Sequence, residues 1–90
     1  MRTKTIIAGL KNSQKFRFIL TANSGEAVGM TLTVQQMADQ FATTAARTAV
    51  WEALEKLTQN RQKAKLSGQN TPSGLVCEAP GFRHVQVDLF

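Results

Sequence analysis

The chain has 90 residues, which fits one domain with a small core. Apolar residues make up 42% of the sequence, within the range of folded proteins, and this argues against disorder throughout. Eleven Lys and Arg against six Asp and Glu give a net charge of +5, which favours a polyanionic partner, most often nucleic acid.

The chemistry-bearing residues are few. A single cysteine, Cys77, cannot form an intrachain disulfide, and we expect it to pack as a small hydrophobe in a reducing compartment. His84 is the only histidine, so neither a metal site nor a cofactor is expected. No stretch approaches the ~20 apolar residues of a membrane span, which indicates a cytoplasmic protein. No catalytic constellation or small-molecule site is evident, so an enzyme is not expected.

The first predicted element covers residues 12–22, and its pattern is ambiguous. As a helix it would place Phe16, Ile19 and Leu20 on one face, whereas the alternation in "KFRF" is typical of a strand. The helix is the preferred interpretation. Residues 5–8 could form a short strand, and the Gly- and Ser-containing stretch 23–30 reads as a loop.

A second helix is predicted from Val34, capped by Thr33 with Gln36 as the partner in a capping box. The apolar stripe of this helix reaches Phe41, and another apolar stripe begins at Val50. Phe41 and Val50 are nine residues apart, which is a rotation of about 900°, or two and a half turns. One straight helix would therefore point these two stripes in opposite directions. We therefore predict a turn near residues 42–45 and two helices, although the alanines that follow leave one continuous helix open.

The third helix could run to about residue 65. A mobile loop is expected around residues 66–74, where Gly68, Pro72 and Gly74 interrupt the apolar period. A C-terminal hairpin follows, with strands predicted at 75–79 and 84–90 and a turn at "PGFR". The chain is thus predicted to be one domain, 1–90, mainly α with a C-terminal β-hairpin.

This order of elements, and two stretches within it, resemble winged helix-turn-helix regulators. "MTLTVQQMADQF" is similar to their second helix, with Thr33 and Ala38 at the matching positions. "ARTAVWEALEKL" resembles the recognition helix of GntR-type regulators, in which Arg-Thr, a Val and Glu-Ala-Leu recur. The match covers about residues 30–57. The turn is two residues longer than the family's, and the wing is delayed by the segment 58–74.

The resemblance implies a small transcriptional regulator that binds double-stranded DNA in a sequence-specific manner. We expect it to act as a homodimer, because one small module offers limited specific surface. The start of the recognition helix would face base edges. Basic residues further along the helix and in the loop would contact phosphates, and the hairpin tip would act as the wing. Competing interpretations are a helix cap for the threonines and a solvated side chain for the arginine. The candidate DNA-binding residues are Thr43, Thr44, Arg47, Thr48, Lys56, Arg61, Lys63, Lys65, Arg83 and His84.

Two rival hypotheses remain open. The chain could be a non-enzymatic protein-binding accessory or inhibitor module, with an α+β meander packed on one long helix over residues 34–65. It could also bind RNA, although its aromatic residues do not interleave with the basic ones as a base-stacking surface requires.

Overall fold

The computed structural model describes residues 10–40 and 44–90. Its strands are β1 (Lys15–Ala22), β2 (Ala27–Thr33), β3 (Gly74–Ala79) and β4 (Phe82–Leu89), and its helices are α1 (Val34–Gln40) and α2 (Thr44–Ser67). The strands form one antiparallel sheet in the order β2-β1-β4-β3. The strand predicted at 5–8 lies outside the described residues.

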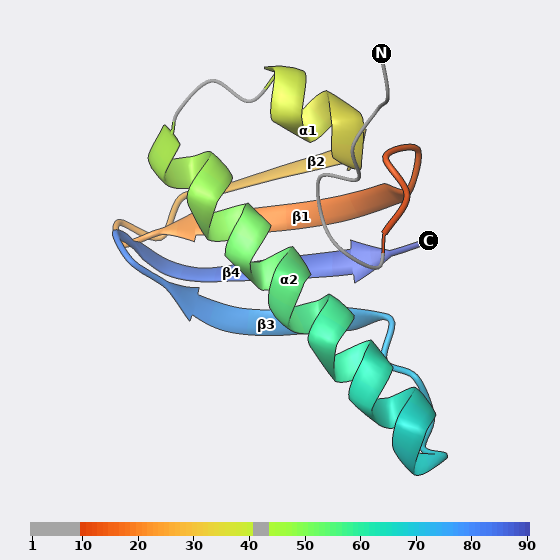
Figure 1. Ribbon diagram of the computed structural model, residues 1–90. Coiled ribbons are helices and arrows are strands. Elements are labelled where there is room, and N and C mark those ends of the chain that lie inside the picture. The colour runs from red at the N-terminus through yellow and green to blue at the C-terminus, as the bar shows by residue number, and fades with distance from the viewer. Residues whose placement is uncertain (1–9, 41–43) are drawn as a thin grey trace.

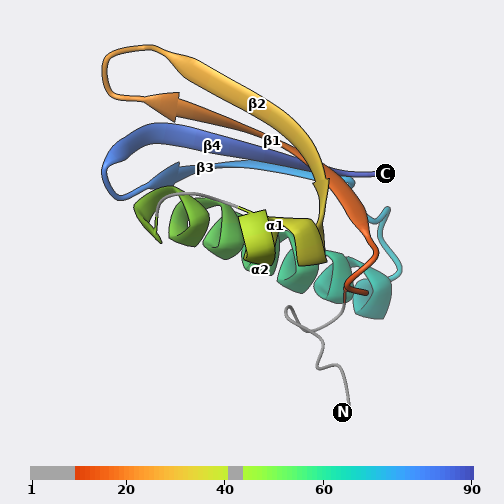
Figure 2. The same cartoon turned by 90° about the horizontal axis from the view of Figure 1, so that it is seen from above.

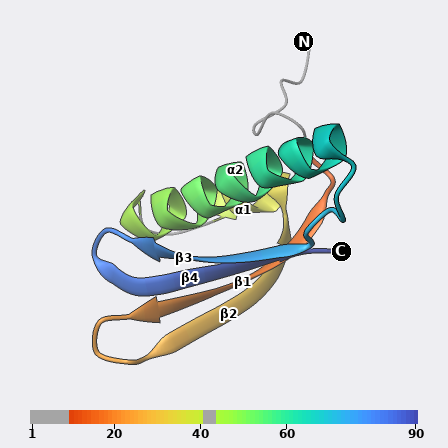
Figure 3. The same ribbon diagram turned by 90° about the horizontal axis from the view of Figure 1, so that it is seen from below.

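The molecule has two layers, shown in Figure 1 and from two further sides in Figures 2 and 3. Both helices lie on the same face of the sheet. The long helix α2 crosses that face diagonally, and its last turns project past the edge formed by β3. The opposite face is covered by no element among the described residues.

Residues 15–22 form a strand, so the helix predicted over 12–22 is wrong. Phe16, Phe18 and Leu20 are buried at a spacing of two and face the helices. Ile19 lies on the opposite face and is only half-buried. The alternation was hard to recognise because an apolar residue also occupies the uncovered face, which imitates the spacing of a helix.

The predicted fold class is therefore corrected. The chain is not mainly α with a winged helix-turn-helix, because residues 15–22, predicted to belong to the first helix of that fold, form β1, and four strands make one sheet. The C-terminal hairpin is not a projecting wing, since β4 pairs with both β1 and β3 inside the sheet. The alternative, an α+β arrangement on one long helix, is closer, although the sheet includes the C-terminal hairpin.

Three local predictions are confirmed. The region 33–57 contains two helices, of which α1 ends at Gln40 and α2 begins at Thr44; most of the predicted turn at 42–45 lies outside the described residues. In the capping box, the Thr33 amide donates to Gln36 Oε1 at 2.9 Å and the Gln36 amide donates to Thr33 Oγ1 at 3.0 Å. The hairpin joins β3 and β4 through Pro80 and Gly81, and Gly81 has a φ of 83°, which glycine adopts without strain.

The core lies between α2 and the sheet. Helix α2 contributes buried residues at the spacing of one helical face, from Ala46 to Leu57. Cys77 is partly buried and packs against this core, which confirms its predicted packing role, and Trp51 packs against the same core. The fully buried large side chains are Phe16, Phe18, Val34, Met37, Val50, Leu54, Leu57, Val85 and Val87.

Candidate nucleic-acid interface

The second half of α2 carries lysines on its exposed surface. Lys56, Lys63 and Lys65 are exposed, and none has an ion pair among the described residues. Seven residues separate Lys56 from Lys63, which is 20° short of two full turns, so both project from nearly the same side. A lysine in the last turn, such as Lys65, also complements the helix dipole, but the two earlier ones have no such structural reason.

Arg61 has a different role from these lysines. It is half-buried, and its guanidinium donates to the Pro72 carbonyl oxygen at 2.6 Å. The Gln69 amide also donates to the Ala64 carbonyl at 2.9 Å. Arg61 therefore holds the segment between α2 and β3 against the helix, in the region where the sequence predicts a mobile loop.

Two further lysines come from the beginning of the sheet. Lys11 and Lys15 are exposed, and the Phe90 amide donates to the Lys15 carbonyl at 3.4 Å. The neighbouring Leu89 amide donates to Ser73 at 2.8 Å, so the start of β1 lies at the same end of the sheet as the segment that follows α2. We call this region the basic end and define it by five exposed lysines. Lys15 is on the uncovered face of the sheet, because it alternates with buried Phe16, whereas the α2 lysines project from the helix layer. The five are Lys11, Lys15, Lys56, Lys63 and Lys65.

Arg17 is next to this region but is partly neutralised. Its guanidinium lies 3.4 Å from Asp88 Oδ2, and the Gln86 side-chain amide donates to the same oxygen at 3.1 Å. Both charged side chains are on the uncovered face of the sheet, where Arg17 and Asp88 are cross-strand partners. An exposed pair of this kind contributes little stability but lowers the local positive charge.

Carboxylates are more numerous towards the other end of the molecule, although Glu55 directly precedes Lys56 and Asp88 lies beside Arg17. Glu52 and Glu55 are in the first half of α2, and Glu26 and Glu78 are close to the turns at the other end of the sheet. Figure 1 shows the β1–β2 and β3–β4 turns and the beginning of α2 on that same side. The exposed glutamates thus lie mainly towards the turns and the lysines of α2 towards the other end, and this uneven distribution would favour approach of a polyanion to the lysines.

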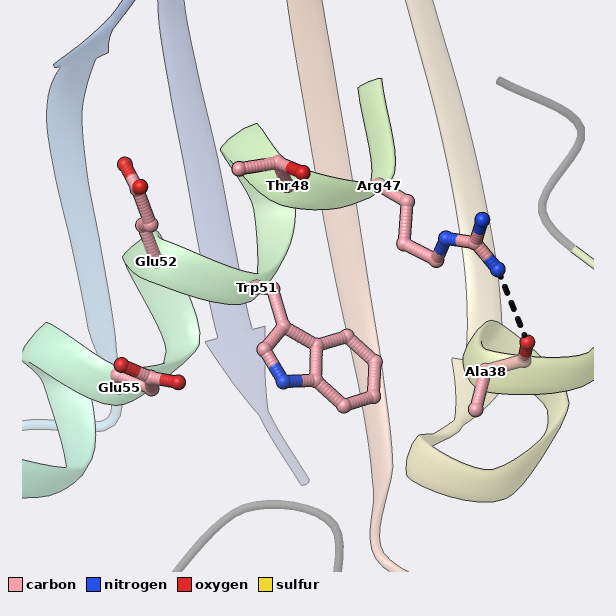
Figure 4. Close-up of a pocket in the computed structure, with 6 residues that line it drawn as sticks. All are labelled: Ala38, Arg47, Thr48, Trp51, Glu52 and Glu55. Carbon is pink, nitrogen blue, oxygen red and sulfur yellow. Dashed lines mark hydrogen bonds between the residues drawn. The ribbon is translucent and has the colours of Figure 1, made fainter. Parts of the chain in front are cut away.

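The residues predicted to read bases are differently placed. Thr43 lies outside the described residues, and α2 begins at Thr44. Arg47 donates to the Ala38 carbonyl at 3.2 Å, so its guanidinium joins α2 to the end of α1 (Figure 4). Thr48 is exposed beside it. Without a helix-turn-helix, nothing in this arrangement assigns them to base edges.

The two remaining candidates lie near the β3–β4 turn. Arg83 is exposed, and its guanidinium donates to the Asn23 carbonyl at 3.0 Å, which ties the two hairpin turns together. His84 is half-buried opposite Thr21 in the register of β1 and β4. Both are at the opposite end of the sheet from the basic end, so the ten candidates do not form one site.

A shallow groove of about 450 Å³ lies between α1 and α2, and the sequence did not indicate it. Its wall includes Arg47, the half-buried ring of Trp51, and the carboxylates of Glu52 and Glu55 (Figure 4). The face of an aromatic ring and nearby carboxylates both attract cations. The off-stripe position of Trp51 was the one available signal, because a helix residue one step from the core stripe lies at its border.

The described residues contain no cluster of three or more His, Cys, Asp or Glu that could hold a metal ion. Within the same residues, no helix has the length and apolar character needed to cross a bilayer. The chain matches no protein-family model, and neither the curated proteins nor the solved structures include a significant match.

Proposed function

We propose that the chain binds double-stranded DNA through the basic end, mainly by contacts to phosphates. The observation that carries this proposal is the set of exposed lysines on α2 and at the start of β1, which have no described carboxylate partner. Lysine ammonium groups are flexible point charges, which suit phosphate contacts better than bidentate reading of bases. The proposal therefore concerns affinity and does not include base reading by Thr43, Thr44, Arg47 or Thr48.

The binding should be strongly dependent on salt. Each phosphate neutralised contributes about −0.9 to the slope of log K against log salt concentration. If three to five lysines engage, the slope is about −3 to −4.5. Fluorescence anisotropy with a labelled duplex, measured between about 50 and 200 mM salt, gives this slope directly.

Two comparisons sharpen that experiment. Absent binding, or binding that salt leaves unchanged, contradicts the proposal. Tighter binding to single-stranded RNA in competition with the duplex favours the RNA hypothesis instead. Trp51 is the only tryptophan and lines the groove, not the basic end, so its emission should stay constant during the titration.

A second candidate function is a protein-binding accessory role, which the groove beside Trp51 favours. Glu52 and Glu55 would attract a basic segment of a partner, and the Trp51 ring would pack against a cationic or apolar side chain. A change in Trp51 emission on adding an arginine-rich peptide, without any response to duplex DNA, would support this role over DNA binding.

A further inference from the structure

The edge strand β2 lacks the features that usually protect a sheet edge. Its sequence, AVGMTLT, has no charged residue and no proline, and it pairs with β1 over seven residues without a shift in register. β2 is the last strand on its side of the sheet. The other edge, β3, differs because it carries Glu78 and has a register shift between Cys77 and Ala79. Charges and bulges of that kind prevent edge-to-edge pairing.

The backbone of β2 presents hydrogen-bonding groups outward at alternate residues. The Ala22 amide donates to the Glu26 carbonyl, and the Val34 amide donates to the Gln14 carbonyl, so even-numbered residues face β1. The amides and carbonyls of Ala27, Gly29 and Thr31 therefore point away from the sheet. The next outward amide, that of Thr33, is satisfied by Gln36 Oε1 at 2.9 Å. The outward set consequently centres on Gly29.

The side chains of the same strand expose apolar surface. Val28 is 57% exposed and Met30 is 44% exposed. Their partners in β1 are Leu20 and Phe18, which are buried under the helices, so Val28 and Met30 are on the helix-bearing side of the sheet. No described element covers them there. This edge thus combines a free backbone ladder with two uncovered hydrophobic side chains.

We propose that two copies of the chain pair antiparallel through β2, about a two-fold axis at Gly29, and form a continuous eight-stranded sheet. In this register Ala27 of each copy faces Thr31 of the other, and Gly29 faces Gly29. These pairs use the outward groups and form about six backbone hydrogen bonds, two for each pair. The proposal is independent of nucleic-acid binding.

The same register brings the exposed side chains together. Val28 of each copy lies opposite Met30 of the other, in pairs that do not exchange hydrogen bonds and therefore approach more closely. The four side chains form one apolar cluster around the axis. A register centred on Met30 would instead place Ala27 opposite Thr33, whose amide is already used by Gln36.

Charge also favours a second copy at this edge. Each chain carries +5, so two copies repel one another wherever basic surfaces meet. β2 brings no charged residue to the contact, and its basic neighbours Lys15 and Arg17 are one strand further inside the sheet. Pairing of β2 with β3 of another copy would form open filaments, but Glu78 and the irregular register of β3 disfavour it.

The test uses the full chain and two double variants. Sedimentation velocity over concentrations up to about 0.5 mM should show wild type moving from monomer to dimer. The variant Val28→Lys/Met30→Lys places like charges opposite each other and should stay monomeric, a twofold fall in mass. The variant Val28→Lys/Met30→Glu places opposite charges across the axis and should still dimerise.

Both positions are exposed in the monomer, so circular dichroism and the melting temperature of the monomer should be unchanged in both variants. A wild-type chain that is monomeric at every concentration overturns the proposal. A Val28→Lys/Met30→Lys variant that remains dimeric shows that another surface pairs, and overturns it as well. A monomeric Val28→Lys/Met30→Glu variant contradicts the Gly29-centred register and overturns it too.

Discussion

The variant Lys56→Gln/Lys63→Gln/Lys65→Gln is expected to bind duplex DNA roughly ten- to a hundredfold more weakly than wild type at low salt. The three side chains are exposed on α2, so their neutralisation removes positive charge without disturbing the core. Three lost phosphate contacts should also reduce the magnitude of the salt slope by about 2.7. Anisotropy titrations at several salt concentrations measure both quantities.

A compensated variant separates local charge from net charge. Adding Glu26→Gln, Glu52→Gln and Glu55→Gln to the three lysine changes restores the net charge to +5, because three charges of each sign are removed. All three glutamates are exposed; Glu26 is near the turns at the opposite end of the sheet, and Glu52 and Glu55 precede Lys56 on α2. The compensated variant should bind as weakly as the lysine variant if the basic end makes the contacts. Recovery of wild-type affinity would show that net charge alone governs binding.

Phe18→Ala is expected to have the largest effect on stability. Phe18 is fully buried between β1 and the helices, and truncation of a core phenylalanine costs about 3–5 kcal/mol. Domains of this size are stable by about 5–15 kcal/mol, so much of the free energy of unfolding would be lost. Urea denaturation followed by circular dichroism measures the change.

The matched control for this substitution is its neighbour, Ile19→Ala. Ile19 lies on the uncovered face and is half-buried, so its truncation should cost about 1 kcal/mol. A helix over residues 12–22 would reverse the order, because it buries Ile19 with Phe16 and turns Phe18 outward. A larger loss for Ile19→Ala than for Phe18→Ala would therefore contradict the strand.

Local signals in the sequence predicted the parts of the fold that depend on neighbouring residues. The capping box of Thr33 and Gln36 and the alternation of Val85 and Val87 both specify conformation within a few positions. The two-helix arrangement followed from the phase of the apolar stripes. These features are confirmed because tertiary contacts reinforce the local preference.

The N-terminal hairpin was missed because its pattern depends on distant partners. In β1, Ile19 breaks the alternation of apolar and polar residues. In β2, Gly29 weakens the strand signal, and Val28 and Met30 stay exposed although they are on the helix-bearing side of the sheet. Reading β1 as a helix then completed a helical order that resembled a winged helix-turn-helix. One misassigned element thus changed the fold class.

For the candidate site, the sequence predicted where basic residues are concentrated, but it did not predict which of their side chains form hydrogen bonds within the protein. The absence of acids between residues 56 and 65 indicated the basic stretch of α2. The sequence did not reveal that Arg61 is bound to Pro72 and Arg47 to Ala38, since both contacts depend on how α2 packs. A guanidinium that is hydrogen-bonded within the protein still adds to the positive electrostatic potential, but it is not free to rearrange around a phosphate.

An amide chemical-shift titration of the chain with duplex DNA tests the central claim, that the basic end is the nucleic-acid interface. We expect the shifts to concentrate on residues 11–15 and 56–67, with the Trp51 indole signal unchanged. Shifts centred on the first turns of α2 and on the β3–β4 turn, or no shifts at all, would contradict it.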